Sequence, residues 1–206
     1  MTAARESTLT RAACAAALES FDVRTVERAG HRCAAVALAV VTTDGVPSLL
    51  LTVRPSTMRA HPGQFALPGG GIDAGESPGE AALRELEEEL GVQAPPSSVL
   101  GHLDDFVTRS GYVITPVVVW VGELDAPIRP NAEEVEYVFQ VSMAELDHDP
   151  QFLSVPGSAQ PLIEWPFRGA RIFAPTAAMI YQFREVALHG RPTRVDELGQ
   201  PDFASR

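Results

Sequence analysis

Residue types that bind phosphate and metal ions gather between Gly69 and Val92. Three consecutive glycines open this stretch, and Glu85, Glu88 and Glu89 follow in a helical pattern. At about 100° per residue, the three glutamates share one helix face within an arc of about 100°. Carboxylates this close repel one another at neutral pH, and a hard divalent cation such as Mg²⁺, which takes oxygen ligands, removes that repulsion. The alternative interpretation is a solvated acidic helix face.

The sequence also predicts the helix that carries these glutamates. Ser77 is a capping residue, Pro78 suits the first helical position, and Glu80 completes a capping box. Gly91 can adopt the left-handed conformation that ends a helix. The opposite face should meet a core through its leucines, whereas Glu85 and Glu89 are expected on an exposed face. The leucines of the core face are Leu83, Leu86 and Leu90.

This stretch is similar to the signature of the Nudix hydrolase family at every fixed position. The matching residues are Gly70, Glu76, Arg84, Glu85, Leu86, Glu88, Glu89, Gly91 and Val92. The resemblance implies hydrolysis of a nucleoside diphosphate linked to another moiety, with Mg²⁺ or Mn²⁺ as cofactor. It also implies a one-domain α/β fold, an α/β/α sandwich with a mixed sheet, in which the glycine loop and the helix follow a strand.

The resemblance further implies roles for individual residues. The implied metal ligands are Glu85, Glu88, Glu89 and the backbone carbonyl of Gly69. Arg84 would orient a carboxylate by ion pairing, and Glu76 would brace the glycine loop.

Related enzymes often place one more glutamate beside the metals, in a loop that follows the central strands. Glu134 matches that position best, with Glu133 and Glu136 as neighbours. Because Nudix enzymes vary in which glutamate accepts the proton of the attacking water, Glu85 and Glu134 are both candidates for the general base. For any one glutamate of this loop, a solvated acidic surface is the alternative.

Two arginines, Arg54 and Arg59, precede the glycines. Guanidinium groups bind phosphate oxygens bidentately, although a surface ion pair is the alternative for each arginine alone. Residues 50–70 resemble the additional motif of coenzyme A pyrophosphatases within the Nudix family, and coenzyme A carries a 3′-phosphate besides its diphosphate. Two positions depart from that motif: Pro55 replaces a small residue and Leu67 replaces a phenylalanine. The arginines are therefore predicted to bind substrate phosphate.

The combined resemblances imply hydrolysis of coenzyme A or acyl-coenzyme A to 3′,5′-ADP and (acyl-)4′-phosphopantetheine. A first alternative is a Nudix activity on ADP-ribose, dinucleoside polyphosphates or oxidised nucleotides, which the arginine motif disfavours. A second alternative is a non-catalytic binding or regulatory module on the same scaffold. Such modules usually lose a glutamate from the metal-binding face, and this sequence retains all three.

Composition restricts the partners. The 206 residues carry a formal net charge of −11, which argues against nucleic acid and anionic lipid as partners and leaves a small nucleotide as substrate. Two cysteines, Cys14 and Cys33, provide no disulfide framework and no metal-binding spacing. No apolar run reaches transmembrane length, and we expect a cytoplasmic protein.

Apolar runs and turn signals predict the remaining elements. A helix over residues 6–21 should pack on the domain or form a homodimer contact. The Asp44-Gly45 pair indicates a hairpin turn between strands at 33–41 and 46–53. Further predicted elements are strands at 100–106, 112–121 and 137–141, a helical turn at 143–146, a hairpin or irregular strand pair over 151–166, and a helix over 172–188.

Several positions connect these elements to the substrate. Ser110 lies in a hairpin or substrate-binding loop, because a Ser-Gly pair recurs there in the coenzyme A subfamily. Pro116 should mark the start of the next strand or a bulge. Trp165 is expected as a packing anchor or a wall of the ligand site. We expect an N-terminal helical extension over residues 1–30, the Nudix domain over 31–190, and a loosely held tail over 191–206.

Overall fold

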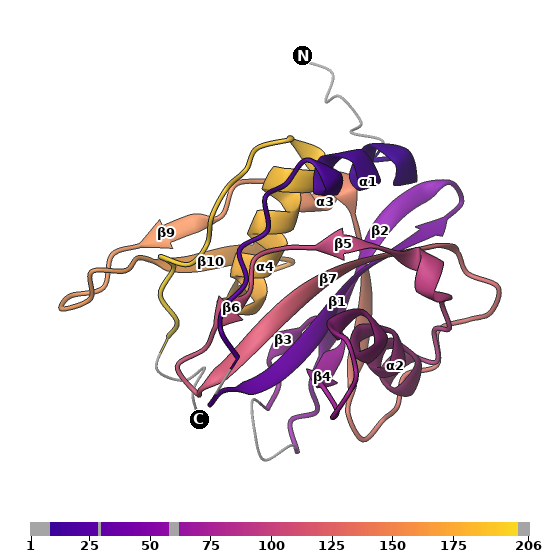
Figure 1. The fold of residues 1–206 in the computed structure, drawn as a ribbon, viewed down its shortest axis with the longest axis horizontal. Coiled ribbons are helices and arrows are strands. Elements are labelled where there is room, and N and C mark those ends of the chain that lie inside the picture. The colour runs from indigo at the N-terminus through magenta and orange to yellow at the C-terminus, as the bar shows by residue number, and fades with distance from the viewer. Residues whose placement is uncertain (1–8, 29, 58–61, 202–206) are drawn as a thin grey trace.

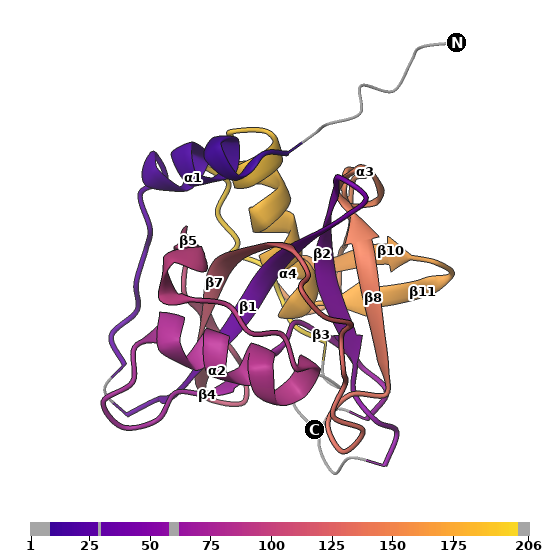
Figure 2. The same ribbon diagram turned by 90° about the vertical axis from the view of Figure 1, so that its right-hand side faces the viewer.

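The computed structural model describes residues 9–28, 30–57 and 62–201, and shows a mixed sheet covered by helices on both faces (Figures 1 and 2). The main sheet consists of β1 (Arg32–Thr43), β2 (Val46–Val53), β3 (Phe65–Ala66), β4 (Gly69–Gly71), β5 (Val99–His102), β6 (Phe106–Val107), β7 (Tyr112–Glu123) and β8 (Tyr137–Ser142). A small second sheet contains β9 (Gln151–Leu153), β10 (Leu162–Phe167) and β11 (Ala170–Phe173). The helices are α1 (Arg11–Glu19), α2 (Pro78–Leu90), α3 (Met143–Leu146) and α4 (Thr176–Phe183), with a 3₁₀ turn η1 (Pro96–Ser98) and a π-helical turn η2 (Arg184–Leu188). The predicted α/β class is confirmed.

Strand β1 organises the main sheet. It pairs in parallel with β7 along its whole length, and its other edge pairs first with β4 and then with β2, both antiparallel. The β1–β2 hairpin is confirmed, with Asp44 and Gly45 both at positive φ, 50° and 76°. Two positive φ angles in succession are the geometry of a type I′ hairpin turn. The glycine strand β4 is thereby held against the edge of β1 beyond the end of β2.

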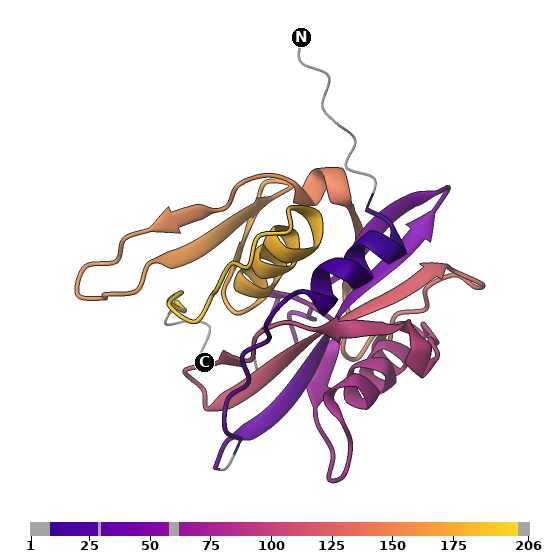
Figure 3. The ribbon, with the colours of Figure 1, turned by 45° about the horizontal axis from the view of Figure 1, so that its top comes forward.

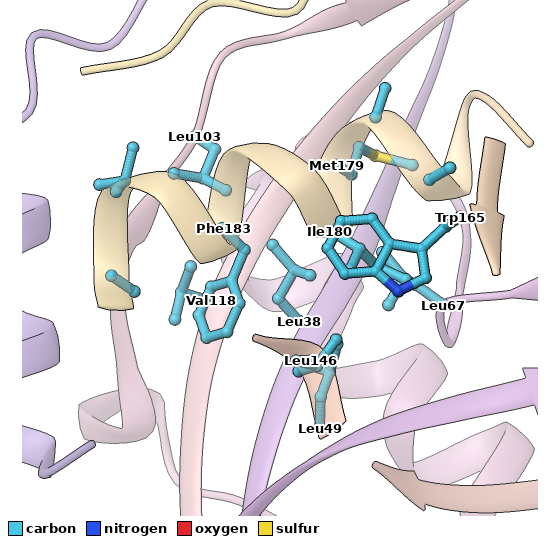
Figure 4. Packing of buried hydrophobic residues seen from close by; sticks show 14 of the residues in the cluster. Leu38, Leu49, Leu67, Leu103, Val118, Leu146, Trp165, Met179, Ile180 and Phe183 are labelled. Atoms are coloured by element: carbon cyan, nitrogen blue, oxygen red, sulfur yellow. The ribbon is translucent and has the colours of Figure 1, made fainter. Parts of the chain in front are cut away.

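The two faces of the sheet bury different residues because side chains alternate along a strand. On the α2 face, alanines of β1 meet Leu86 and Leu90, both with no exposed surface. On the opposite face, α1 and α4 cover the strands (Figure 3), and larger side chains fill the core. Figure 4 shows this second core around Leu38, Val118, Trp165, Ile180 and Phe183. Trp165 is 1% exposed, so it is a packing anchor.

The predicted strands agree with the structure at most positions, but the single strand expected over residues 100–106 is wrong, because β5 ends at His102 and β6 begins only at Phe106. A second difference concerns Pro116. This proline lies inside β7 and is buried, which contradicts a position at the strand's start or at a bulge. Its missing N–H faces the break between β5 and β6, where the ladder on that edge is interrupted. A proline is tolerated in the strand because no hydrogen bond of the ladder is lost there.

The helix predicted over residues 172–188 begins later than expected. Ile172 and Phe173 belong to β11, and the helix starts at Thr176 after Pro175. The cause is a hairpin turn in which Arg168 and Gly169 both have positive φ, so that the chain returns along β10 before it coils. The apolar residues Ile172 and Phe173 suit a strand as well as a helix, so the sequence pattern alone did not show where the helix begins.

The expectation of a loosely held tail is wrong for residues 191–201. Val195 is 1% exposed, and Arg194 donates two hydrogen bonds to Asp104, at 2.8 and 3.0 Å. The Gly199 N–H donates to the Pro161 carbonyl at 2.9 Å. The charged residues that suggested a solvated tail are the ones that attach it.

At the N-terminal end, α1 starts at Arg11, later than predicted, with the Thr10 hydroxyl capping it. Cys14 is completely buried, and burial raises the pKa of its thiol to about 12. This fits the role of a small apolar core residue. Within the described ranges, no helix combines the length and the apolar character needed to cross a membrane.

Candidate active site

Helix α2 presents the glutamates, and its ends are as the sequence predicts. The Ser77 hydroxyl accepts from the Glu80 N–H, and the Glu80 carboxylate accepts from the Ser77 N–H at 2.8 Å, which completes the capping box. Gly91 ends the helix at φ 65°. Buried Leu86 and Leu90 determine the rotation of the helix about its axis, and therefore the direction in which its glutamates point.

Glu85 and Glu89 are not exposed, contrary to expectation. Glu89 is 5% exposed and the Glu85 side chain 13%, whereas the Glu88 side chain is 56% exposed. The physical reason is a loop that the sequence does not place: the Asn131 N–H donates to the Glu89 carbonyl at 2.8 Å, so residues 127–135 lie against the end of α2. Two of the three carboxylates are thus withdrawn from bulk water.

The glycines of β4 approach this face so closely that side chains would not fit. A methyl group added at Gly70 would overlap the Glu85 carboxylate, and one added at Gly69 would overlap the backbone of β1 at Ala35. Gly71 has open space at the same position. Close approach of backbone to functional groups is a characteristic use of glycine. The backbone of β4 therefore lies directly beside the carboxylates.

Arg84 connects the glycine loop with the glutamate face. Its Nε and Nη2 donate to the two oxygens of Glu76 at 2.9 and 3.0 Å. Its Nη1 donates to Glu85 at 2.7 Å and to Glu88 at 3.1 Å, and Nη2 also donates to the Gly71 carbonyl at 2.9 Å. The hydrogen bond from Arg84 is the main reason that the pKa of Glu76 lies below its usual range. The ion pairing expected of Arg84 is present.

Glu76 also closes the loop on itself, because one of its oxygens accepts from the Asp73 N–H at 3.0 Å. The loop between β4 and α2 is therefore held from both sides, by its own backbone and by Arg84.

The electrostatics of the site centre on Glu89. Burial raises its pKa to about 8, and the charges of Glu85 and Glu134 add to this rise. The charge of Arg54 and a hydrogen bond from the Gly69 N–H act in the opposite direction without cancelling it. Burial likewise raises the pKa of Glu85, against the hydrogen bond from Arg84.

Glu134 belongs to this group of carboxylates although it comes from a distant loop. Its charge raises the pKa values of both Glu85 and Glu89, which places it within electrostatic reach of both. Glu133 is exposed, and the Glu136 carboxylate accepts from the Ser56 N–H at 3.2 Å, at the rim of the loop. Among the glutamates of this loop, Glu134 is the one that the electrostatics connect with α2.

The residue set suits a hard divalent cation. Among the described residues, no three side chains of the metal-binding types converge closely enough to form a ready-made site, and Arg84 engages oxygens of Glu85 and Glu88. However, Glu89 lies buried beside two other carboxylates, and its raised pKa means that the neighbouring cations do not compensate its ionised form. Oxygen donors with excess negative charge are the chemistry that Mg²⁺ and Mn²⁺ prefer.

A cleft of about 290 Å³ lies on the other side of the β4 glycines, toward α4. Its lining residues are Ala34, Val36, Arg54, Gln64, Phe65, Ala66, Leu67, Gly69, Gly70, Gly71, Thr108, Ser110, Tyr112, Ile114, Pro175, Thr176, Met179 and Gln200. The predicted substrate residues Arg54 and Ser110 both belong to it. The Nε of Arg54 is buried, and no residue of the described ranges accepts a hydrogen bond from it. Arg59 lies outside the described residues.

Several cleft residues were not predicted. Thr176 and Met179 come from α4, and Gln200 from the C-terminal segment. For Thr176 there was a partial signal, since residues 172–180 are similar to an element of the coenzyme A subfamily. For Gln200 there was none, because its position depends on contacts with residues about a hundred positions earlier.

Residues 31–165 match the family model of the NUDIX domain, well over half of the chain. The chain therefore belongs to the NUDIX domain family.

Curated relatives include the mitochondrial coenzyme A diphosphatase NUDT8 of Mus musculus, 41% identical over 128 residues, which are 60% of this chain and 61% of that protein. The uncharacterized Nudix hydrolase NudL of Escherichia coli (strain K12) is 39% identical over 123 residues, or 59% of this chain and 63% of that protein. Nudix hydrolase 3 of Caenorhabditis elegans is 38% identical over 114 residues, 54% of this chain and 48% of that protein. The chain thus spans about half to three fifths of the length of these relatives.

Similar solved structures include the Nudix hydrolase RenU from M. smegmatis, with a TM-score of 0.49 and 21% identity over 76% of this chain and 85% of that one. The MutT protein from Methanosarcina mazei Go1 has a TM-score of 0.46 and 23% identity over 62% of this chain and 83% of that one.

Proposed function

We propose that this protein hydrolyses the diphosphate bond of coenzyme A or acyl-coenzyme A, giving 3′,5′-ADP and (acyl-)4′-phosphopantetheine. The observation that carries the proposal is that Arg54 belongs both to the cleft and to the surroundings of the glutamate site. Arg54 lines the cleft with a buried, unpaired Nε within the described structure, and its charge also acts on Glu89. The name of the mouse relative, a coenzyme A diphosphatase, supports the same substrate.

Glu85, Glu88, Glu89 and the Gly69 carbonyl would hold Mg²⁺ or Mn²⁺. When bound, the ion would offset charge on the diphosphate oxygens and increase the acidity of water. The protein supplies the scaffold for this chemistry: Arg84 and Glu76 hold the loop, and the glycine backbone of β4 lies directly beside the Glu85 carboxylate.

Glu85 and Glu134 are the two candidates for accepting the proton of the attacking water. A general base works best when its pKa is close to the working pH. Burial raises the pKa of Glu85 toward that range, and Arg84 fixes the orientation of its carboxylate at 2.7 Å. Glu134 is proposed from a separate loop, because its charge also acts on Glu85 and Glu89.

The arginines would bind the remaining phosphates. Arg54 would reach a phosphate in the cleft, where its guanidinium can donate more than one hydrogen bond. Arg59 is proposed for the 3′-phosphate, on the basis of the sequence motif. Ser110 would contact the substrate from the opposite wall.

Product identification tests this proposal. The protein is incubated with coenzyme A and Mg²⁺, and the products are identified by mass spectrometry. We expect 3′,5′-ADP and 4′-phosphopantetheine in equal amounts. A protein that leaves coenzyme A intact but cleaves ADP-ribose, a dinucleoside polyphosphate or an oxidised nucleotide under the same conditions has a different Nudix substrate. A protein that cleaves none of them is the non-catalytic module.

The homodimer, the cytoplasmic location and the limits of the domain stay predictions. The mitochondrial location in the mouse relative's name describes that relative and is not transferred to this chain.

A further inference from the structure

The C-terminal segment, defined here as residues 191–201, lies beyond the part of the chain that matches the family model. It nevertheless reaches the cleft, because Gln200 is one of the lining residues. The Gln200 residue is only 8% exposed. A buried polar side chain at the end of a chain needs partners, and these partners indicate what it does.

Gln200 makes two hydrogen bonds to the backbone of the β6–β7 hairpin. Its Oε1 accepts from the Arg109 N–H at 3.2 Å, and its Nε2 donates to the Val107 carbonyl at 3.0 Å. The same turn carries Thr108 and Ser110, whose hydroxyl groups lie 3.0 Å apart, and both residues line the cleft. The Thr108 hydroxyl is also hydrogen-bonded to the backbone N–H and carbonyl of Tyr112, within the hairpin. The amide of Gln200 therefore supports the turn that presents the Ser110 hydroxyl to the cleft.

The segment is attached firmly enough to act as a wall. Fixing the backbone of each residue costs conformational entropy, so an ordered segment of this kind requires specific contacts. Arg194 binds Asp104 through two hydrogen bonds, and the buried Asp104 also accepts from Gln182 on α4 at 2.8 Å. Val195 is buried, and Gly199 bonds to the Pro161 carbonyl. These contacts define where Gln200 lies.

We infer that Gln200 is a positioning residue for substrate binding, and that the C-terminal segment completes the cleft. Gln200 holds the 108–110 turn so that Ser110 can hydrogen-bond the part of the substrate that extends from the diphosphate into the cleft. That part combines hydrogen-bonding groups with an apolar body, since Leu67 and Met179 line the same cleft. The inference rests on the proposed hydrolysis of a nucleoside diphosphate derivative, but not on coenzyme A as the substrate.

The test compares Gln200→Ala and Gln200→Glu with Asp196→Asn. Asp196 is a matched control in the same segment, since its 3.6 Å ion pair with Arg24 is 59% exposed on both sides and lies away from the cleft. We expect Gln200→Ala to raise KM about tenfold, as expected for a buried polar contact, with kcat changed less than about threefold. Gln200→Glu keeps an acceptor for the Arg109 N–H but turns a carboxylate oxygen toward the Val107 carbonyl, so its KM should rise at least as much as that of Gln200→Ala. Asp196→Asn should match the wild type.

The readouts separate positioning from general stability. A structural role alone would lower the melting temperature of Gln200→Ala and leave the KM of the folded fraction unchanged, which would overturn the inference. If Gln200→Ala does not fold, Gln200→Glu decides, because it has nearly the same shape. An unchanged KM in that variant also overturns the inference.

The choice of substrate keeps this test distinct from that of the proposed function. KM is measured with whichever of coenzyme A and ADP-ribose the wild type hydrolyses, and calorimetry measures the binding of both to metal-free protein. If only ADP-ribose reacts, coenzyme A is excluded as substrate and the role of Gln200 is tested on ADP-ribose. If the wild type neither hydrolyses nor binds either compound, both proposals are wrong.

Discussion

The two sides of the glycine strand β4 have opposite chemistry. On the α2 side, Glu85 and Glu89 are withdrawn from water beside one another, and burial raises the pKa values of both. On the α4 side, the cleft is lined by apolar side chains, hydroxyl groups and Arg54. Between them lies a backbone without side chains, since a methyl group at Gly70 would overlap Glu85.

This contrast indicates a division of work between bond cleavage and recognition. We expect cleavage of the diphosphate to depend on the charged side, which is the α2 side with its carboxylates. We expect selection of the group attached to the diphosphate to depend on the cleft. Variants on the α2 side should therefore change kcat, and variants in the cleft should change KM. Each prediction below tests this division, beginning with the largest expected effect.

Loss of a carboxylate from the charged side should abolish most turnover. We expect Glu85→Gln and Glu89→Gln each to lower kcat on the order of 100-fold or more, because each removes charge at the reacting phosphates. The fold should persist, since an amide at position 89 is easier to bury than a carboxylate. Glu87→Gln is the matched control on the same helix, at an exposed position. Wild-type kcat in both site variants would refute the assignment.

A side chain added to β4 should lower kcat at Gly70 and leave it unchanged at Gly71. Gly70→Ala should lower kcat by about 10- to 100-fold, because the methyl group displaces the Glu85 carboxylate, and shifts of about 1 Å can have such effects. Gly71→Ala is the control, since nothing lies within 4 Å of the added methyl group. Steady-state kinetics decide: equal effects of the two substitutions would contradict a specific approach of Gly70 to Glu85.

The degree to which these two sides could be predicted differs for a physical reason. The charged side lies within one contiguous stretch, so capping residues and helical periodicity were sufficient to predict α2 and the grouping of its glutamates. Even there, the burial of Glu89 was missed, because it depends on residues 127–135 folding back against the helix. Local patterns determine which residues share a face, but not what covers that face.

The cleft could be predicted only in part. Arg54 and Ser110 were identified through family motifs, whereas Met179 and Gln200 were not. Thr176 marks the start of α4 only because the β10–β11 hairpin ends before it, and the apolar residues that precede it suit a strand or a helix equally. Gln200 is placed by a chain of long-range contacts through Asp104, which no local signal contains. A wall built from separate segments requires the tertiary structure.

The arginine motif allows a test of recognition with a substrate pair. Arg59→Ala should raise KM for coenzyme A about tenfold, the typical value of a charge-assisted hydrogen bond, and change KM for 3′-dephospho-coenzyme A much less. The control is Arg24→Ala, which removes an exposed arginine with a surface ion pair of little energetic value. Equal changes for the two substrates would contradict a role of Arg59 at the 3′-phosphate.

The buried charge of Glu89 should make the stability of the metal-free protein depend on pH. Its pKa is about 8 in the folded state against an ordinary value of 4.5, so between these values the folded state retains a proton that the unfolded state releases. The free energy of unfolding should therefore fall as pH rises from about 4.5 to 8, and Glu89 should not change it outside that window.

In Glu89→Gln this contribution is absent, so the variant should have a higher melting temperature than the wild type at pH 8 and a similar one at pH 5. Each kcal/mol of difference in the free energy of unfolding corresponds to about 2–4 °C in the melting temperature. Mg²⁺ should reduce the difference at pH 8, because a bound cation stabilises the carboxylate. Thermal denaturation in a chelator and then in Mg²⁺ measures both effects, and parallel pH curves for the two proteins would show that Glu89 is ionised without cost and that the charged side is better solvated than its burial indicates.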